Sequence, residues 1–174
     1  MTDTDRTPLE LVRLLHASTN ALAAEVWALG PQATARPAEG EWCANEVLGH
    51  LIEADRRGFA GRIRTVIAED RPTFVKWDQP GVAAARKDNL RDPGELIQEF
   101  MSARETDLAF MAELDPAVMA RVGIHPTVGE LSVGDLLNEW VHHDREHLAQ
   151  MLAVTQSQVR PFMGNAQKFG QPKP

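Results

Sequence analysis

Four long stretches of the chain place apolar residues at the spacing that one face of an α-helix requires. The first begins at Thr7, with Pro8 at the first helical position and Glu10 three residues after Thr7, which is a capping-box pattern. It ends at the Gly30-Pro31 pair. Its apolar stripe is formed by Leu9, Val12, Leu15, Leu22, Val26 and Leu29.

The other three stretches cover residues 43–68, 92–114 and 132–155, and each carries an acidic residue three positions after its first residue. Asp92 and Ser132 are usual helix caps, whereas Cys43 is an unusual one. Because each predicted helix has one apolar stripe, the four helices must bury those stripes against one another. The pattern therefore predicts an all-α protein built as a four-helix bundle, with a domain at residues 1–155 and a polar tail at 156–174.

The second and third helices are joined by a long connection, residues 69–92. A connection of this length can cross the whole bundle, so a simple up-down-up-down order is not required. Its segment Phe74–Pro80 is a candidate to cover an opening in the bundle. The overlapping segment Pro72–Trp77 is the only β-like fragment, and no confident strand is predicted.

Composition excludes several functional classes. The net charge is −7 and no block of Lys or Arg offsets it, which disfavours nucleic acid as a partner. The single cysteine, Cys43, cannot form an intramolecular disulfide, and a reducing cytoplasm fits that composition. The N-terminus is polar and acidic, unlike a signal peptide, and no apolar run approaches the ~20 residues of a membrane span. We therefore expect a cytoplasmic protein without a membrane partner.

The fourth predicted helix contains three of the six histidines within Trp140–Met151. Steps of three and four residues place His143 and His147 in the same apolar stripe as Trp140 and Met151. His142 falls instead on a polar row that includes Asp135, Asn138, Glu139 and Glu146. The helical period therefore predicts that His143 faces inward and that His142 faces solvent.

Histidines four positions apart on a helix lie on one face, so both imidazoles can reach the same metal ion. A third ligand must come from another helix, and His50 in the second helix is the candidate. His16 is a weaker alternative, and His125 is expected near a pocket mouth at one end of the bundle. The pair His143 and His147 can also be explained without metal, as boundary histidines hydrogen-bonded to carboxylates.

The order and spacing of these motifs resemble the DinB-like metal-binding four-helix bundle family. The resemblance rests on Trp42 and His50 in "EWCANEVLGH", and on His143-Asp144, His147 and Gln150 in "HDREHLAQ". It spans nearly the whole chain, and Cys43 departs from the Ser or Thr that is usual at that cap. The resemblance implies an up-down-down-up bundle, frequently a homodimer, with a divalent ion, zinc or nickel, on three histidines. Relatives of this kind include thiol-dependent S-transferases that use bacillithiol or mycothiol, and a mycothiol-dependent isomerase.

Two functions remain open on this basis. The first is a metal-dependent enzyme with His50, His143 and His147 as ligands, in which the ion activates a low-molecular-weight thiol or, as the less favoured case, water. Asp144 and Glu146 are candidates to orient ligands or accept a proton. Asp144 would at most support the histidine ligands and would not bind the metal itself. Glu53 and Asp55 are expected to be solvated. The second is a non-catalytic dimeric bundle that binds a ligand or partner, with an empty or structural metal site.

Overall fold

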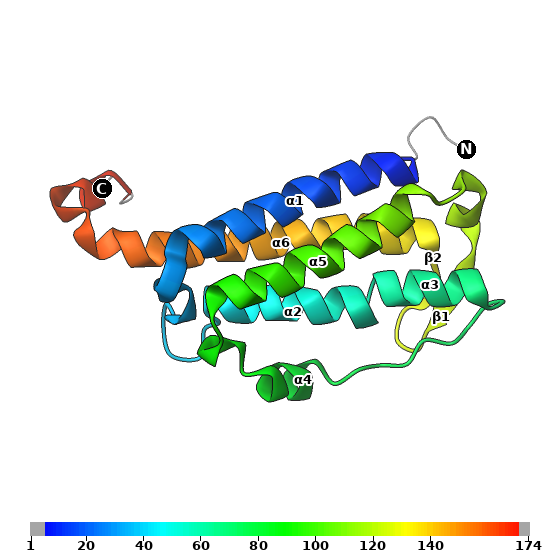
Figure 1. Cartoon of the computed structure of the whole chain (residues 1–174), viewed down its shortest axis with the longest axis horizontal. Helices are drawn as coiled ribbons and strands as arrows, with labels where there is room; N and C mark the ends of the chain where they lie inside the picture. The colour runs from blue at the N-terminus through cyan, green and yellow to red at the C-terminus, as the bar shows by residue number, and fades with distance from the viewer. Residues whose placement is uncertain (1–5, 171–174) are drawn as a thin grey trace.

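The computed structural model describes residues 6–170. Five helices form the bundle: α1 (Pro8–Leu29), α2 (Ala44–Arg57), α3 (Ala60–Ala68), α5 (Pro93–Ala112) and α6 (Val133–Val159). A shorter helix, α4 (Gln79–Arg86), lies outside it (Figure 1). The bounds predicted for the first helix are confirmed, with Thr7 and Glu10 forming the expected capping box. None of the described helices is both long and apolar enough to cross a membrane.

The bundle has the up-down-down-up order. In Figure 1, α1 and α6 run in one direction, whereas α2, α3 and α5 run in the opposite direction. The connection between α3 and α5 carries the chain back along the outside of the bundle, which is why it is long. Helix α1 packs against α5 and α6, and α2 also packs against α5 and α6. The predicted fold class is therefore confirmed.

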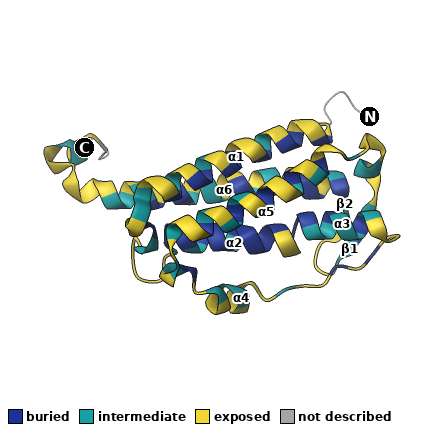
Figure 2. Cartoon of the chain, viewed as in Figure 1, coloured by how far each residue is buried: buried dark blue, intermediate teal, exposed yellow. Residues whose placement is uncertain are grey.

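The apolar stripes of the helices meet in two adjoining core clusters. One cluster centres on Leu15, Ile63 and Trp140, and the other on Leu48 and Phe100, all of them fully buried. Figure 2 shows that the buried residues lie on the faces that the bundle helices turn toward one another. Apolar burial of this kind contributes roughly 25 cal/mol for each Å² removed from water, so these stripes hold the helices together.

The second predicted helix, residues 43–68, is not continuous. It breaks at Gly58 and Phe59, where both backbone N–H groups donate to Ala54 O at 2.7 and 2.9 Å. Phe59 has φ −112° and ψ −83°, outside the helical region, and α3 begins after it. The break turns the Phe59 ring into the core, parallel to Trp140 with ring centroids 5.7 Å apart. The apolar spacing continued across the break, so the sequence pattern alone did not reveal it.

The long connection is held to the bundle by ion pairs. Arg86, at the end of α4, donates to Asp88, Glu53 and Glu99 at distances of 2.7 to 3.4 Å. The Asp88 carboxylate lies over Gly49 of α2 so closely that a Cβ there would be 1.8 Å from it. Only glycine at position 49 therefore allows the connection to lie this close to α2.

A small β-hairpin precedes α6, in a segment where no strand was predicted. Strand β1 (Val122–His125) pairs antiparallel with β2 (Gly129–Ser132). Thr73 forms a parallel bridge to Ile124, so part of the predicted β-like fragment does extend the hairpin. Strands of four residues are too short for an alternating pattern to be recognised against the helical background.

At its C-terminal end, α6 continues to Val159, past the predicted end near Thr155. Two 3-10 helices follow, Arg160–Phe162 and Gly164–Gly170, and they extend beyond the end of the bundle (Figure 1). The division into a domain at 1–155 and a tail at 156–174 stays a prediction.

Candidate metal centre

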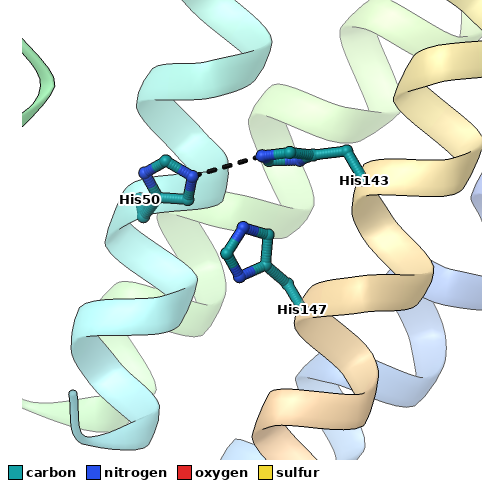
Figure 3. A group of neighbouring side chains, drawn as sticks. All are labelled: His50, His143 and His147. Atoms are coloured by element: carbon teal, nitrogen blue, oxygen red, sulfur yellow. Dashed lines mark hydrogen bonds between the residues drawn. The ribbon is translucent and has the colours of Figure 1, made fainter. Parts of the chain in front are cut away.

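Three histidines from two helices meet between α2 and α6. His50 lies on α2, and His143 and His147 lie one turn apart on α6 (Figure 3). One ring nitrogen of each lies within 4.8 Å of those of the other two. The Nε2 atoms of His50 and His143 are 3.3 Å apart. The three histidines that the sequence motifs singled out are therefore brought together.

The ring orientation of His147 is set by its neighbour one turn further along α6. His147 Nδ1 lies 2.8 Å from Gln150 Oε1. An amide oxygen only accepts hydrogen bonds, so Nδ1 carries the hydrogen and Nε2 keeps a free lone pair. Figure 3 shows this ring turned toward His50 and His143. A histidine held in this way is a typical metal ligand, with its second nitrogen bonded to a partner that fixes the tautomer.

Burial keeps two of the three imidazoles neutral at physiological pH. Desolvation, followed by the charge of His147, lowers the pKa of His50 to about 4. Desolvation, followed by His147 and His50, lowers the pKa of His143 to about 3. Neutral imidazoles offer lone pairs, which is the form that binds metal. His143 Nδ1 is buried and has no hydrogen-bond partner among the described residues.

Aromatic rings surround the three histidines. The ring centroids of Trp42 and Trp77 lie 5.2 and 6.4 Å from that of His50. Phe59 lies on the other side, with its ring centroid 5.1 Å from that of His143. Trp77 comes from the long connection, so the segment that was expected to cover an opening does lie against the site.

A cavity of about 850 Å³ opens beside His143. Its walls are formed by α2, α3, α6, β1 and the segment Lys76–Pro80. Glu139, one turn before His143 on α6, and His125 of β1 both line it. His125 was expected near a pocket mouth, and this placement agrees. A second hollow of about 610 Å³ lies on the other side of His50, under α4. Volumes of this size suit small-molecule ligands.

A second buried polar cluster lies between the same helices. Arg104 of α5 is fully buried and donates five hydrogen bonds, to Asp55 of α2, Asp144 of α6 and Thr19 of α1. Its guanidinium carbon lies 5.0 Å from the centre of the Phe100 ring and 5.1 Å from that of the Trp140 ring. This cluster, Arg104 with Asp55, Asp144 and Thr19, joins all four arms of the bundle.

The Arg104 cluster corrects what was expected of the acidic residues. Asp55 and Glu53 are not solvated, since they are only 1% and 4% exposed. Glu53 accepts hydrogen bonds from Arg56, Arg57 and Arg86. Asp144 bonds Arg104 rather than any of the three histidines, so it does not support a ligand directly.

The remaining histidines lie away from the centre. His142 is exposed, and its Nδ1 lies 3.7 Å from a carboxylate oxygen of Glu146 on the outer face of α6. His16 is exposed on α1. The helical period therefore separated His143 from His142 correctly, and the weaker alternative His16 is not part of the group of three histidines.

Comparison with known proteins agrees with this geometry. Residues 14–151 match the family model of the DinB superfamily. The chain belongs to the DinB superfamily. It is 30% identical over 132 residues to the Bacillus subtilis protein YuaE, covering 68% of this chain and 80% of YuaE.

Two further relatives carry functional names. The chain is 25% identical over 116 residues to the Oceanobacillus iheyensis protein named "Putative metal-dependent hydrolase OB0782", covering 66% of each, just under two thirds of that relative. It also resembles a solved structure of YfiT from Bacillus subtilis, with a TM-score of 0.77, 17% identity and 86% of both chains covered. YfiT is described as "a probable metal-dependent hydrolase with an unusual four-helix bundle topology". At this identity the likeness to YfiT shows the fold alone.

Sequence reasoning missed two residues of this region of the DinB-superfamily chain. Glu139 is exposed, as its polar row predicted, but it also lines the cavity, and its spacing of four residues before His143 could have indicated this. Arg104 gave no signal, because a charged residue within a long amphipathic helix is normally solvent-exposed.

Proposed function

We propose that this chain is a metal-dependent enzyme whose divalent ion, zinc or nickel, is held by His50, His143 and His147. The observation that carries the proposal is the convergence of three imidazole nitrogens within 4.8 Å beside a cavity of about 850 Å³. Three protein ligands leave coordination positions free, which is the arrangement of catalytic rather than closed structural zinc sites. The cavity gives a substrate access to those positions.

The donor set fits such an ion. In a tetrahedral site with Zn–N bonds of about 2.0–2.1 Å, two ligand nitrogens lie ~3.3 Å apart. The Nε2 atoms of His50 and His143 have that separation, 3.3 Å. Burial favours the neutral form of both rings, and Gln150 leaves the Nε2 lone pair of His147 free. These are the protonation states that metal ligation needs.

Bound there, a divalent ion would lower the pKa of a water or thiol that reaches it and so supply a nucleophile at neutral pH. The chain's own residues have separate roles. Glu139 lines the cavity one turn before His143 and is placed to accept a proton from that nucleophile. Phe59 and Trp77 border the cavity and limit the access of water. Cys43 is buried at the start of α2 and does not line the cavity, so it supplies no thiol itself.

Hydrolysis through an activated water is the reaction class that the name of the Oceanobacillus relative supports. Transfer of a low-molecular-weight thiol is the second candidate, and the size of the cavity favours it because both a thiol and its electrophile need room. Ester turnover that is independent of added thiol would support hydrolysis. Turnover that requires the thiol and consumes it would support transfer.

The metal assignment is tested by melting the protein with and without added zinc or nickel. A ligand that binds only the folded state stabilises it by about 2.7 kcal/mol at a hundredfold excess over Kd. We expect the wild type to melt at a higher temperature with metal, and His50→Ala to gain far less. His16→Ala is the matched control, since His16 is an exposed helical histidine outside the cluster, and it should gain as much as the wild type.

Elemental analysis of untagged protein purified without a chelator completes the test. A stoichiometric zinc or nickel content that disappears in His50→Ala supports the proposal. An equal melting shift in wild type and His50→Ala would contradict it. A wild type with neither bound metal nor a metal-induced shift would favour the alternative, a non-catalytic bundle that binds a ligand or partner.

A further inference from the structure

The cavity carries two positive groups that no carboxylate of residues 6–170 pairs with. Arg62 of α3 and Lys76 of the long connection both line it, and neither forms an ion pair with a carboxylate within residues 6–170. Arg62 is half-buried, and its Nε atom is buried with no hydrogen-bond partner in the same part of the chain. A buried donor left unpaired costs free energy, so an arginine in this state is prepared to bind an acceptor.

The position of Arg62 is determined by packing. Its guanidinium carbon lies 5.2 Å from the centre of the Phe74 ring. Phe74 in turn lies against Gly123 of β1, where an added Cβ would come within 2.3 Å of the ring. The glycine on β1 therefore leaves room for the tip of the Phe74 ring, and Phe74 in turn supports Arg62 at the cavity wall.

Arg64, two residues further along α3, is an arginine whose charge is paired within the protein, and it serves as a comparison for Arg62. Its guanidinium donates to Asp107 at 2.8 Å and lies 4.0 Å from the centre of the Phe110 ring. Arg64 thus has both a carboxylate and an aromatic partner, whereas Arg62 has only the aromatic one. The difference is that, among the described residues, no carboxylate pairs with Arg62.

His125 adds a neutral donor to the same wall. Its Nδ1 accepts the backbone N–H of Thr127 at 3.2 Å, so in the neutral ring the hydrogen lies on Nε2. Burial, and then the charges of Arg62 and Lys76, lower the pKa of His125 and favour that neutral ring. Arg62 and Lys76 are therefore close enough to His125 for their positive charges to disfavour its protonation.

The two carboxylates of the cavity do not neutralise these groups. Asp78 accepts the backbone N–H of Gly81 at 3.1 Å as the cap of α4. Glu139, on α6, forms no ion pair with Arg62 or Lys76 among the described residues. The cavity therefore has a histidine end and an outer end that carries unpaired cationic donors.

We infer that the outer end of this cavity is an anion-binding subsite in which Arg62 and Lys76, with His125 as a neutral donor, hold a carboxylate or phosphate group of the small molecule whose reacting end lies at the three histidines. The identity of that reacting end rests on the proposed function. Binding of the anion does not, because no donor of the subsite is one of the three histidines.

Titration calorimetry on the full-length, metal-free protein tests the subsite, with inorganic phosphate and succinate as separate probes. We expect the wild type to bind at least one of them, and Arg62→Gln and Lys76→Gln each to weaken that binding by about tenfold, the effect of a lost hydrogen bond to a charged group. The tighter probe identifies the anion as a phosphate or a carboxylate. Arg64→Gln is the matched control and should bind within about twofold of the wild type.

Three results would overturn the subsite. They are no binding of either probe by the wild type, unchanged binding in both Arg62→Gln and Lys76→Gln, and an equal loss in Arg64→Gln, which would indicate a general effect of charge.

Zinc titration of the same variants separates this inference from the proposed function. Arg62→Gln should keep its zinc affinity, while His143→Ala should lose zinc and keep the probe. If His143→Ala loses zinc but still binds the probe, the anion-binding subsite is supported independently of the metal-binding role of the three histidines.

Discussion

Two polar clusters connect α2 with α6, the Arg104 cluster fully buried and the histidine cluster partly buried, and they differ in how completely their groups are paired. The Arg104 cluster uses all five guanidinium N–H groups, in hydrogen bonds to Asp55, Asp144 and Thr19. In the histidine cluster, only His147 has a partner outside the cluster, through Gln150, among the described residues. The Arg104 guanidinium has no free N–H left, while the histidine cluster presents lone pairs to a cavity.

The comparison separates a polar cluster that holds a fold from one that binds a ligand. A fully paired cluster resists change, because removing one member leaves charges buried without partners. A cluster with free lone pairs adds little to stability by itself, but it gains strongly when an ion satisfies those lone pairs. We therefore expect substitutions in the Arg104 cluster to affect stability, and substitutions in the histidine cluster to affect ligand binding.

The largest effect is expected from Arg104→Met. This change leaves Asp55 and Asp144 buried without their cation, and breaking a buried pair in this way typically costs about 3–5 kcal/mol. Urea denaturation followed by circular dichroism would measure the loss in the free energy of unfolding. His143→Ala is the comparison, and its metal-free form should lose much less. Equal losses in the two variants would remove the distinction between the clusters.

The next effect concerns metal affinity and separates two adjacent histidines. His143→Ala should abolish stoichiometric metal binding, because two ligands from different helices, His50 and His147, hold an ion weakly. His142→Ala should bind as the wild type does, since His142 is exposed on the outer face of α6. Metal titration monitored by calorimetry measures both. If His142→Ala lost the ion and His143→Ala kept it, the face of α6 that carries His142 would have to be the one facing α2, which would contradict the prediction.

Acid should destabilise the metal-free protein through the histidine cluster. Burial lowers the pKa of His50 to about 4 and that of His143 to about 3, whereas both titrate near ~6.5 in the unfolded chain. The unfolded chain therefore binds more protons below about pH 6.5, so stability is complete above that pH and is lost as the pH falls toward 4. Each histidine contributes up to about 1.4 kcal/mol for each pH unit.

The Arg104 cluster should respond to pH with the opposite sign. Burial, opposed by Arg104, raises the pKa of Asp55 to about 7, so the contribution of Asp55 to stability is present at low pH and lost as the pH rises through 7.

The acid sensitivity assigned to the histidines is tested in the double variant with His50→Phe and His143→Phe, whose stability should no longer fall with acid. Urea denaturation at several pH values between about 4 and 7 gives this slope. A slope in the double variant equal to that of the wild type would contradict the assignment of acid sensitivity to the histidines.

The smallest effect is expected from Gln150→Ala. The glutamine only orients His147, and losing a partner of this kind typically costs about tenfold to a hundredfold in metal affinity. Stability without metal should hardly change, because Gln150 is half-buried near the surface. Zinc affinity by competition with a chromophoric chelator would measure it. An affinity equal to that of the wild type would mean that the bond to Gln150 does not orient the ligand.

Much of the fold followed from local sequence signals. The caps at Thr7, Asp92 and Ser132 begin helices where they were predicted, because capping depends on residues within one turn. The helical period was also enough to turn His143 inward and His142 outward. The break at Gly58 and the four-residue strands of the hairpin were missed, because the apolar spacing ran through the break and the strands are too short for a pattern.

The sequence by itself determined the helices, their buried faces and the histidines that meet between α2 and α6. The pairing of the polar groups was decided only by the tertiary structure. Arg104 finds Asp55, Asp144 and Thr19 on three other helices, and these partners are 40 to 85 residues away along the chain. Read from the sequence, Asp55 is a solvated position, Asp144 stands behind the histidines, and Arg104 gives no signal of burial. Whether a buried polar group binds its neighbours or remains free for a ligand depends on distances between helices, and no local pattern encodes those distances.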